Sequence, residues 1–175
     1  MRNLIILVCL GLSAYFGYQW LSKGGGAATA LWGSATPCGR ISKFMDAQLP
    51  AVLGPMVNRD AVGNYWAQKM PVTELMQMRT ALKTEAATAA RTDGPRYQAA
   101  LAVCDALESL MKEQQAAYVK FEASVQGLTK YGASWEQITE RHNARWIERS
   151  AQLMAGITKA YGQASQAETA ALGAK

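Results

Sequence analysis

Apolar residues recur every three or four positions along most of the chain, which is the spacing of an amphipathic helix. Pro71 and Pro95 suit the first turn of a helix, and Ser134 with Gln137 matches a capping box. No segment alternates with a period of two, so we expect no β-sheet. The long helices predicted in this way cover residues 71–91, 95–130 and 134–170.

The link between the last two of these helices is short and contains Gly132. A link of this length joins antiparallel neighbours, so the two helices should form a hairpin with coiled-coil-like packing. Folding the chain about Gly132 places Glu122 opposite His142 and Tyr118 opposite Trp146. The first long helix should pack against this hairpin, antiparallel to the second.

Residues 38–70 carry shorter apolar runs that are interrupted by prolines and glycines. We expect short, broken helices there, laid over the three-helix core, one of them as a fourth helix. The predicted fold class is all-α: an N-terminal transmembrane helix followed by an antiparallel three- or four-helix bundle over residues 37–172.

Residues 1–23 differ from the rest of the chain because they contain no charge between Arg2 and Lys23. Residues 4–21 are about as long as a helix needs to be to cross a bilayer, roughly 20 residues. Aromatic residues near Lys23 are typical of the interfacial end of a span. We therefore expect a retained, uncleaved anchor in the bilayer; the alternative is a signal peptide cleaved after Ala30. These aromatic residues are Tyr15, Phe16, Tyr18 and Trp20.

Residues 24–36 begin with three glycines and show no periodicity, which is typical of a flexible tether. A short leader followed by a large domain most often leaves that domain outside the cytoplasm. The expected location is therefore the inner membrane, crossed once, with the C-terminal domain in the periplasm or outside the cell. The charge bias between the two flanks of the anchor is small.

The cysteines also bear on whether the folded domain lies outside the cytoplasm. Cys9 lies in the anchor, which leaves Cys38 and Cys104 as the pair in the folded domain. Two cysteines in an exported domain predict one disulfide between them. The alternative is a pair of ordinary buried thiols.

Composition narrows the function. The chain has 18 basic and 13 acidic residues, a net charge of +5, but the charges are interspersed rather than gathered as in a nucleic-acid binder. It has one histidine, no C-x-x-C pair and no phosphate-binding loop. We therefore expect no enzyme activity, no cofactor, no metal site and no nucleic-acid partner.

The hairpin carries the residues most suited to recognition. Arg141, Arg145 and Arg149 form a ladder, with successive members four positions apart, in which like charges repel. Either Glu122, together with Glu108 or Glu113, offsets this charge across the hairpin, or an anionic partner does. His142 is expected to be a core-edge histidine near Glu122. The full candidate interaction or ligand face is Tyr118, Glu122, Trp135, Arg141, His142, Arg145, Trp146 and Arg149.

Two functions fit this layout. The first is a membrane-anchored structural or adaptor subunit of an envelope complex, which presents its bundle to another envelope protein or to a second copy of itself. The second is a ligand-sensing or small-ligand-binding bundle at the membrane surface. A cavity walled by Tyr118 and Trp146 would favour the ligand, and a filled core with an exposed apolar strip would favour the protein partner.

Overall fold

The computed structural model describes residues 36–128, 132 and 134–173, all of which belong to one unit, Leu31–Lys175. This part is mostly helical, which confirms the all-α prediction apart from one small hairpin. Its elements, in chain order, are α2 (Pro37–Val52), β1 (Val57–Arg59), β2 (Tyr65–Ala67), α3 (Val72–Thr88), α4 (Gly94–Leu128) and α5 (Trp135–Gly173).

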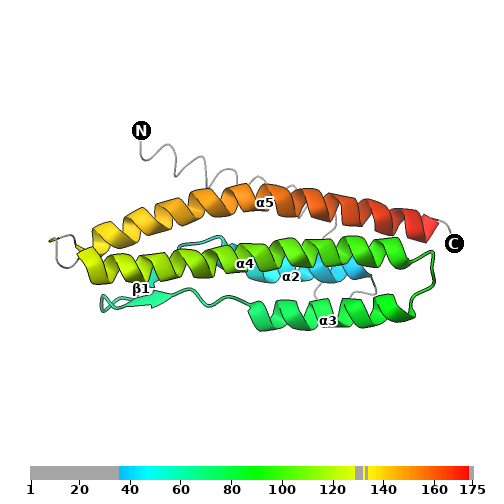
Figure 1. Ribbon diagram of the computed structural model, residues 1–175, viewed down its shortest axis with the longest axis horizontal. Helices are drawn as coiled ribbons and strands as arrows, with labels where there is room; N and C mark the ends of the chain where they lie inside the picture. Colours follow the sequence, from blue (N-terminus) through cyan, green and yellow to red (C-terminus); the bar gives the residue numbers. More distant parts are fainter. Residues whose placement is uncertain (1–35, 129–131, 133, 174–175) are drawn as a thin grey trace. The chain divides into compact units, whose positions relative to one another are not determined.

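Helices α4 and α5 form the predicted antiparallel pair and run side by side along the bundle (Figure 1). The capping box that starts α5 is confirmed: the Gln137 N–H donates to Ser134 Oγ at 3.3 Å, and the Ser134 N–H donates to Gln137 Oε1 at 3.4 Å. His142 lies opposite Ser124, two residues from the expected register. The short link and the apolar stripes therefore sufficed to predict this hairpin.

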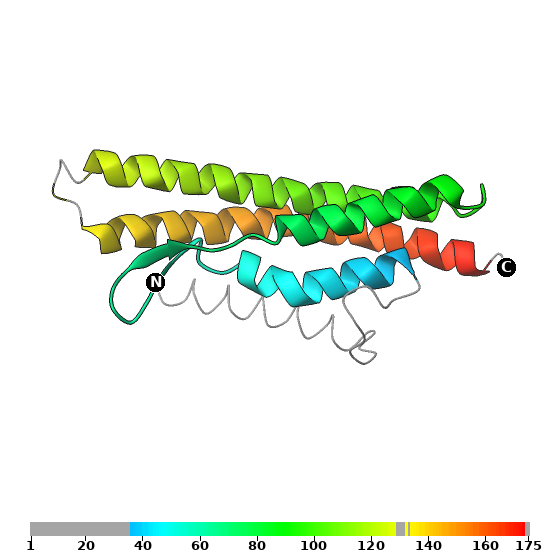
Figure 2. The same cartoon turned by 90° about the horizontal axis from the view of Figure 1, so that it is seen from below.

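Helix α3 packs along α4 in the opposite direction, also as expected (Figure 2). Leu75, Met78 and Leu82 are its buried residues, one per turn. Arg79 ties the two helices together: its guanidinium donates to Asp105 at 2.5 Å and to Glu108 at 2.9 Å.

Helix α2 corrects the prediction of short broken helices, because it is one continuous helix of 16 residues. Thr36 caps it by accepting the Gly39 N–H at 3.2 Å. Pro50 falls in the last turn, so it interrupts only the end of the helix. Arg40 forms a bidentate ion pair with Glu85 of α3. The apolar face of α2 is buried in the bundle through Ile41, Phe44, Met45, Leu49 and Val52.

The expectation of no β-sheet is wrong for residues 57–67, where β1 and β2 pair antiparallel with Asn58 opposite Trp66. The loop explains the pairing, because Asp60 Oδ1 accepts the backbone N–H groups of Val62 and Asn64 at 3.0 and 2.8 Å. Gly63 has a φ of 95°, which a residue with a side chain rarely adopts. Strands of 3 residues are too short to show a period-two pattern.

The predicted anchor, residues 1–23, and almost all of the tether lie outside the described residues. Within the described part of the chain, no helix has both the length and the apolar composition that a membrane span requires.

The predicted disulfide is not formed: Cys38 and Cys104 are both free and buried. They have different neighbours. The Cys38 N–H donates to Glu168 of α5 at 2.8 Å, whereas the charges that act on the Cys104 thiol are those of Asp105 and, from α3, Arg79. The disulfide was predicted by elimination, and an amphipathic pattern shows that a residue is buried but not what it is buried against.

Burial raises the pKa of both thiols to about 12. We therefore expect neither to react with iodoacetamide at pH 8 in the native protein, and both to react at once after denaturation without a reductant. Intact mass of a Cys9→Ser variant provides the count. Denatured, unreduced protein that takes up no label would contradict the free thiols.

Candidate functional site

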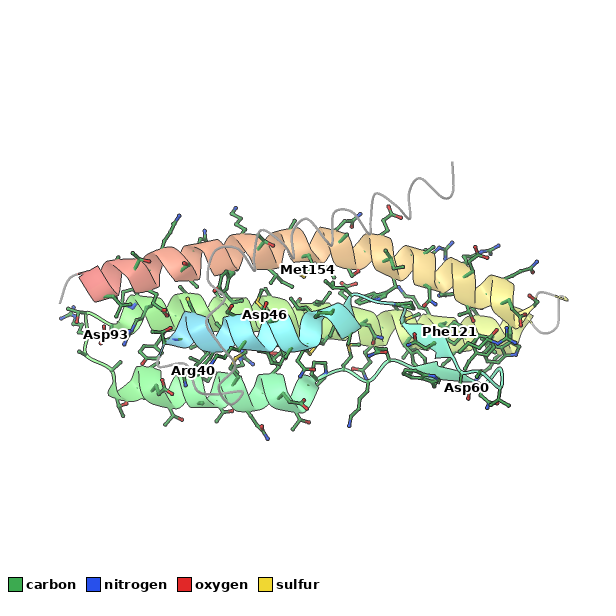
Figure 3. All side chains as sticks on the ribbon, turned by 180° about the vertical axis from the view of Figure 1, so that it is seen from behind. Arg40, Asp46, Asp60, Asp93, Phe121 and Met154 are labelled. Atoms are coloured by element: carbon green, nitrogen blue, oxygen red, sulfur yellow. The ribbon has the colours of Figure 1, made fainter. Side chains whose placement is uncertain are left out.

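One end of the bundle holds the β-hairpin, the end of α4 and the start of α5. Figure 3 shows Asp60 of the hairpin loop beside Phe121 of α4, at the end of the bundle away from Asp93. Asn143 of α5 fixes the hairpin there. Its side-chain oxygen accepts the Val57 N–H at 3.0 Å, and its side-chain nitrogen donates to the Val57 carbonyl at 2.9 Å. One amide thus satisfies both backbone groups of the first strand residue.

Four aromatic residues, here called the aromatic cluster, meet at this end: Tyr65, Tyr118, Phe121 and Trp135. Phe121 lies at the centre, only 3% exposed, with its ring 5.8 Å from Tyr118 and 6.0 Å from Trp135. Tyr65 from the hairpin stacks on Trp135 at 5.1 Å. Such ring pairs stabilise each other beyond the area that they bury. The cluster therefore links β2, α4 and α5.

A cleft opens between the hairpin and α4, beside the aromatic cluster, with a volume of about 240 Å³. Trp66 and Trp135 border it and remain 50% and 40% exposed. We call it the hairpin cleft. Its lining residues are Val57, Tyr65, Trp66, Tyr118, Phe121, Glu122, Val125, Gln126 and Trp135.

Glu122 supplies the carboxylate of the hairpin cleft. Glu122 lies one turn after Tyr118 on α4, close enough for its charge to act on the Tyr118 hydroxyl, and within the described residues no ion pair joins it to the arginine ladder. Burial raises the pKa of Tyr118, and the negative charge of Glu122 raises it further. In the described part of the chain, no cation pairs with Glu122.

The hairpin cleft has a second carboxylate nearby, and this one is paired. The Arg59 guanidinium lies over the Tyr65 ring, 5.5 Å from its centre, and 3.4 Å from Glu136 at the start of α5. The arrangement combines a cation–π contact with an ion pair. The positive charge of Arg59 is therefore already matched by a carboxylate.

The arginine ladder is partly paired. Arg149 donates to Glu113 across the hairpin at 3.2 Å, which confirms one of the structural partners considered. For Arg141 and Arg145, no ion pair forms within the described residues. The positive charges of these two arginines instead lower the pKa of His142, which lies between them in the sequence.

His142 packs edge-on against Phe121, 5.6 Å between ring centres, and its Nε2 lies 3.1 Å from Ser124 Oγ. Burial lowers the pKa of His142, and the positive charges of Arg145 and Arg141 lower it further. The imidazole is therefore held neutral at pH 7, as expected for a core-edge histidine.

Trp146 does not belong to the site. Its side chain is 1% exposed, and its indole N–H donates to the Val52 carbonyl at the end of α2, at 3.2 Å. It fills the core where α2 meets α5. Tyr118 and Trp146, predicted to face each other, therefore do not enclose a common cavity.

The interaction face predicted from the sequence did not include Tyr65, Trp66 or Asn143. Tyr65 and Trp66 stand out as adjacent aromatic residues, and the Asp60, Gly63 and Asn64 pattern before them is a turn signal. Asn143 carries no such signal, because its role depends on a backbone segment 86 positions earlier in the chain.

A second apolar surface follows α3, where Val72 and Met76 are each 46% exposed. The Thr80 and Thr84 hydroxyls donate to the Met76 and Thr80 carbonyls at 2.9 and 3.1 Å, so the polarity of both is used within the helix. This stripe is an exposed apolar strip of the kind that a protein partner covers.

Within the described residues, no group of three or more His, Cys, Asp or Glu side chains could hold a metal ion. Comparison of the chain with protein families, characterised proteins and solved structures found no match.

Replacing Asn143 should loosen the hairpin. Asn143→Leu leaves the Val57 N–H and carbonyl without partners, so we expect the free energy of unfolding to fall by about 1–3 kcal/mol. Amide hydrogen exchange in residues 57–67 should accelerate more than in α3. Gln163→Leu, an exposed amide on the same helix, is the control. Unchanged exchange in the hairpin would contradict the clamp.

His142 predicts a pH dependence. Because its folded pKa lies below the unfolded value of about 6.5, the unfolded state binds a proton first, and stability present above pH 6.5 is lost as the pH falls. Wild type should therefore lose more stability than His142→Gln between pH 7 and 5. NMR titration of this single histidine gives its pKa, and Arg145→Gln should raise it. A value of 6.5 or more in wild type would refute the interpretation.

Proposed function

We propose that this protein is a membrane-anchored structural or adaptor subunit of an envelope complex, and that the hairpin end of its bundle is the docking surface for another protein. The observation that carries the proposal is the exposure of Trp66 and Trp135 beside a buried aromatic core. These two side chains are 50% and 40% exposed, whereas Phe121 beneath them is 3% exposed.

This arrangement suits protein recognition. Tryptophan, tyrosine and arginine carry most of the binding energy in protein interfaces, and they act best when held in place before binding. Stacking on Tyr65 orients Trp135, and the Asn143 clamp holds the hairpin that carries Trp66. A partner that covers both rings would gain apolar burial at little cost in side-chain ordering.

The ligand-binding alternative has less support. Pockets for drug-sized ligands occupy about 300–1,000 Å³ and enclose most of the ligand. The hairpin cleft has about 240 Å³ and opens at the surface beside Trp66 and Trp135. Trp146, the expected wall of an internal pocket, fills the core instead. The cleft therefore suits one side chain of a larger partner better than a whole small ligand.

The membrane part of the proposal rests on the sequence. Residues 4–21 are long and apolar enough to span a bilayer, and the flanking residues suit the interface. With Cys38 and Cys104 free, no disulfide supports an oxidising compartment. The extracytoplasmic position is therefore inferred from the anchor and the size of the domain that follows it.

Photo-crosslinking in native membranes tests docking and location together. The full chain with p-benzoylphenylalanine in place of Trp66 should be recovered in the inner-membrane fraction and should form a light-dependent adduct, identified by mass spectrometry. Leu172, 50% exposed near the far end of α5, is the matched control position and should form none. Trp135→Ala should reduce the adduct at Trp66. A soluble chain, or equal adducts from both positions, would overturn the proposal.

A further inference from the structure

We propose that the hairpin cleft binds one cationic group, the guanidinium or ammonium of an arginine or lysine side chain on the docking partner. The inference rests on the proposed function, and it names the chemical group by which the docking partner would be recognised. It rests on Glu122, a carboxylate that lines an aromatic cleft and pairs with no cation in the described residues.

The walls of the cleft suit a cation. Trp66, Tyr118 and Trp135 all line it, and the negative faces of such rings attract ammonium and guanidinium groups. Aromatic walls alone would accept any apolar group. Glu122 adds a charge that favours cations and excludes anions.

At the same end of the molecule, a guanidinium of the chain itself already contacts an aromatic ring and a carboxylate. Arg59 lies over the Tyr65 ring and beside Glu136, so an aromatic face and a carboxylate share the cation. Tyr118 and Glu122 repeat this pair of groups within the cleft, but without the arginine. An arginine from a partner would complete a second arrangement of the same chemistry.

The charges around the cleft agree with a cationic ligand. The positive charges of Arg141 and Arg145 lower the pKa of His142, whereas the negative charge of Glu122 raises the pKa of Tyr118. Arg59, the cation closest to the cleft wall at Tyr65, is matched by Glu136. The volume of about 240 Å³ admits the end of one long side chain.

The full chain in detergent, labelled with 5-fluorotryptophan, provides a direct test by ¹⁹F NMR. N-acetyl-arginine-methylamide should shift the Trp66 and Trp135 resonances, assigned with Trp→Phe variants. N-acetyl-citrulline-methylamide has nearly the same shape without the charge, and should bind roughly threefold to thirtyfold more weakly. Equal binding of the two probes, or no binding of either, would overturn the inference.

Variants of Glu122 and Tyr118 test whether these two side chains bind the arginine probe. Because Glu122 is exposed, Glu122→Gln should weaken binding of the arginine probe about twofold to fivefold. Glu113→Gln, a carboxylate of the same helix that pairs with Arg149, should leave it unchanged. Tyr118→Phe keeps the wall and should bind within about twofold of wild type, whereas Tyr118→Leu should lose most of the affinity. Retention of full affinity by Glu122→Gln and Tyr118→Leu would overturn the site.

The two proposals fail separately. An adduct at Trp66 with no preference for the arginine probe would preserve the docking surface and refute the cationic group. Selective arginine binding with no adduct in membranes would refute the adaptor and identify the cleft as a site for a free organic cation.

Discussion

The arrangement of the site depends on one side-chain amide, Asn143, which binds both backbone polar groups of Val57. A short hairpin is marginally stable by itself, because it buries little apolar surface. Asn143 replaces the missing strand partner at the edge of β1 and fixes the hairpin to α5. Tyr65 can then stack on Trp135, and the cleft has its second wall. The contact between Asn143 and Val57 thus stabilises a 3-residue strand and also positions one wall of the hairpin cleft.

The neighbouring contacts make this end of the bundle rigid and leave its surface open. Trp146 closes the core by bonding the Val52 carbonyl, a few residues before the hairpin begins. Phe121 supports the rings above it and also packs on His142. Trp135 packs on Phe121 and Tyr65, yet Trp135 and Trp66 remain 40% and 50% exposed. The two exposed rings, with Glu122 beside them in the lining of the hairpin cleft, are the features on which the proposed docking surface rests.

The sequence predicted the helical part well where the signals were local. The capping box at Ser134 and Gln137 starts α5, and the short link at Gly132 gives the antiparallel hairpin. Each depends on residues a few positions apart. The register placed Glu113 within reach of Arg149, because two packed helices of known direction leave little freedom along their axes.

What the sequence by itself determined is therefore the set of long helices, their direction and the apolar segment at residues 4–21. Tertiary structure decided the rest of the site: that Glu122 and Tyr118 line one cleft with the hairpin, that Cys38 and Cys104 remain free, and that residues 57–67 form a hairpin. The reason is physical. Periodicity shows which face of a helix is buried, but the partners of a buried or half-buried side chain are set by how helices rotate and where distant backbone lies.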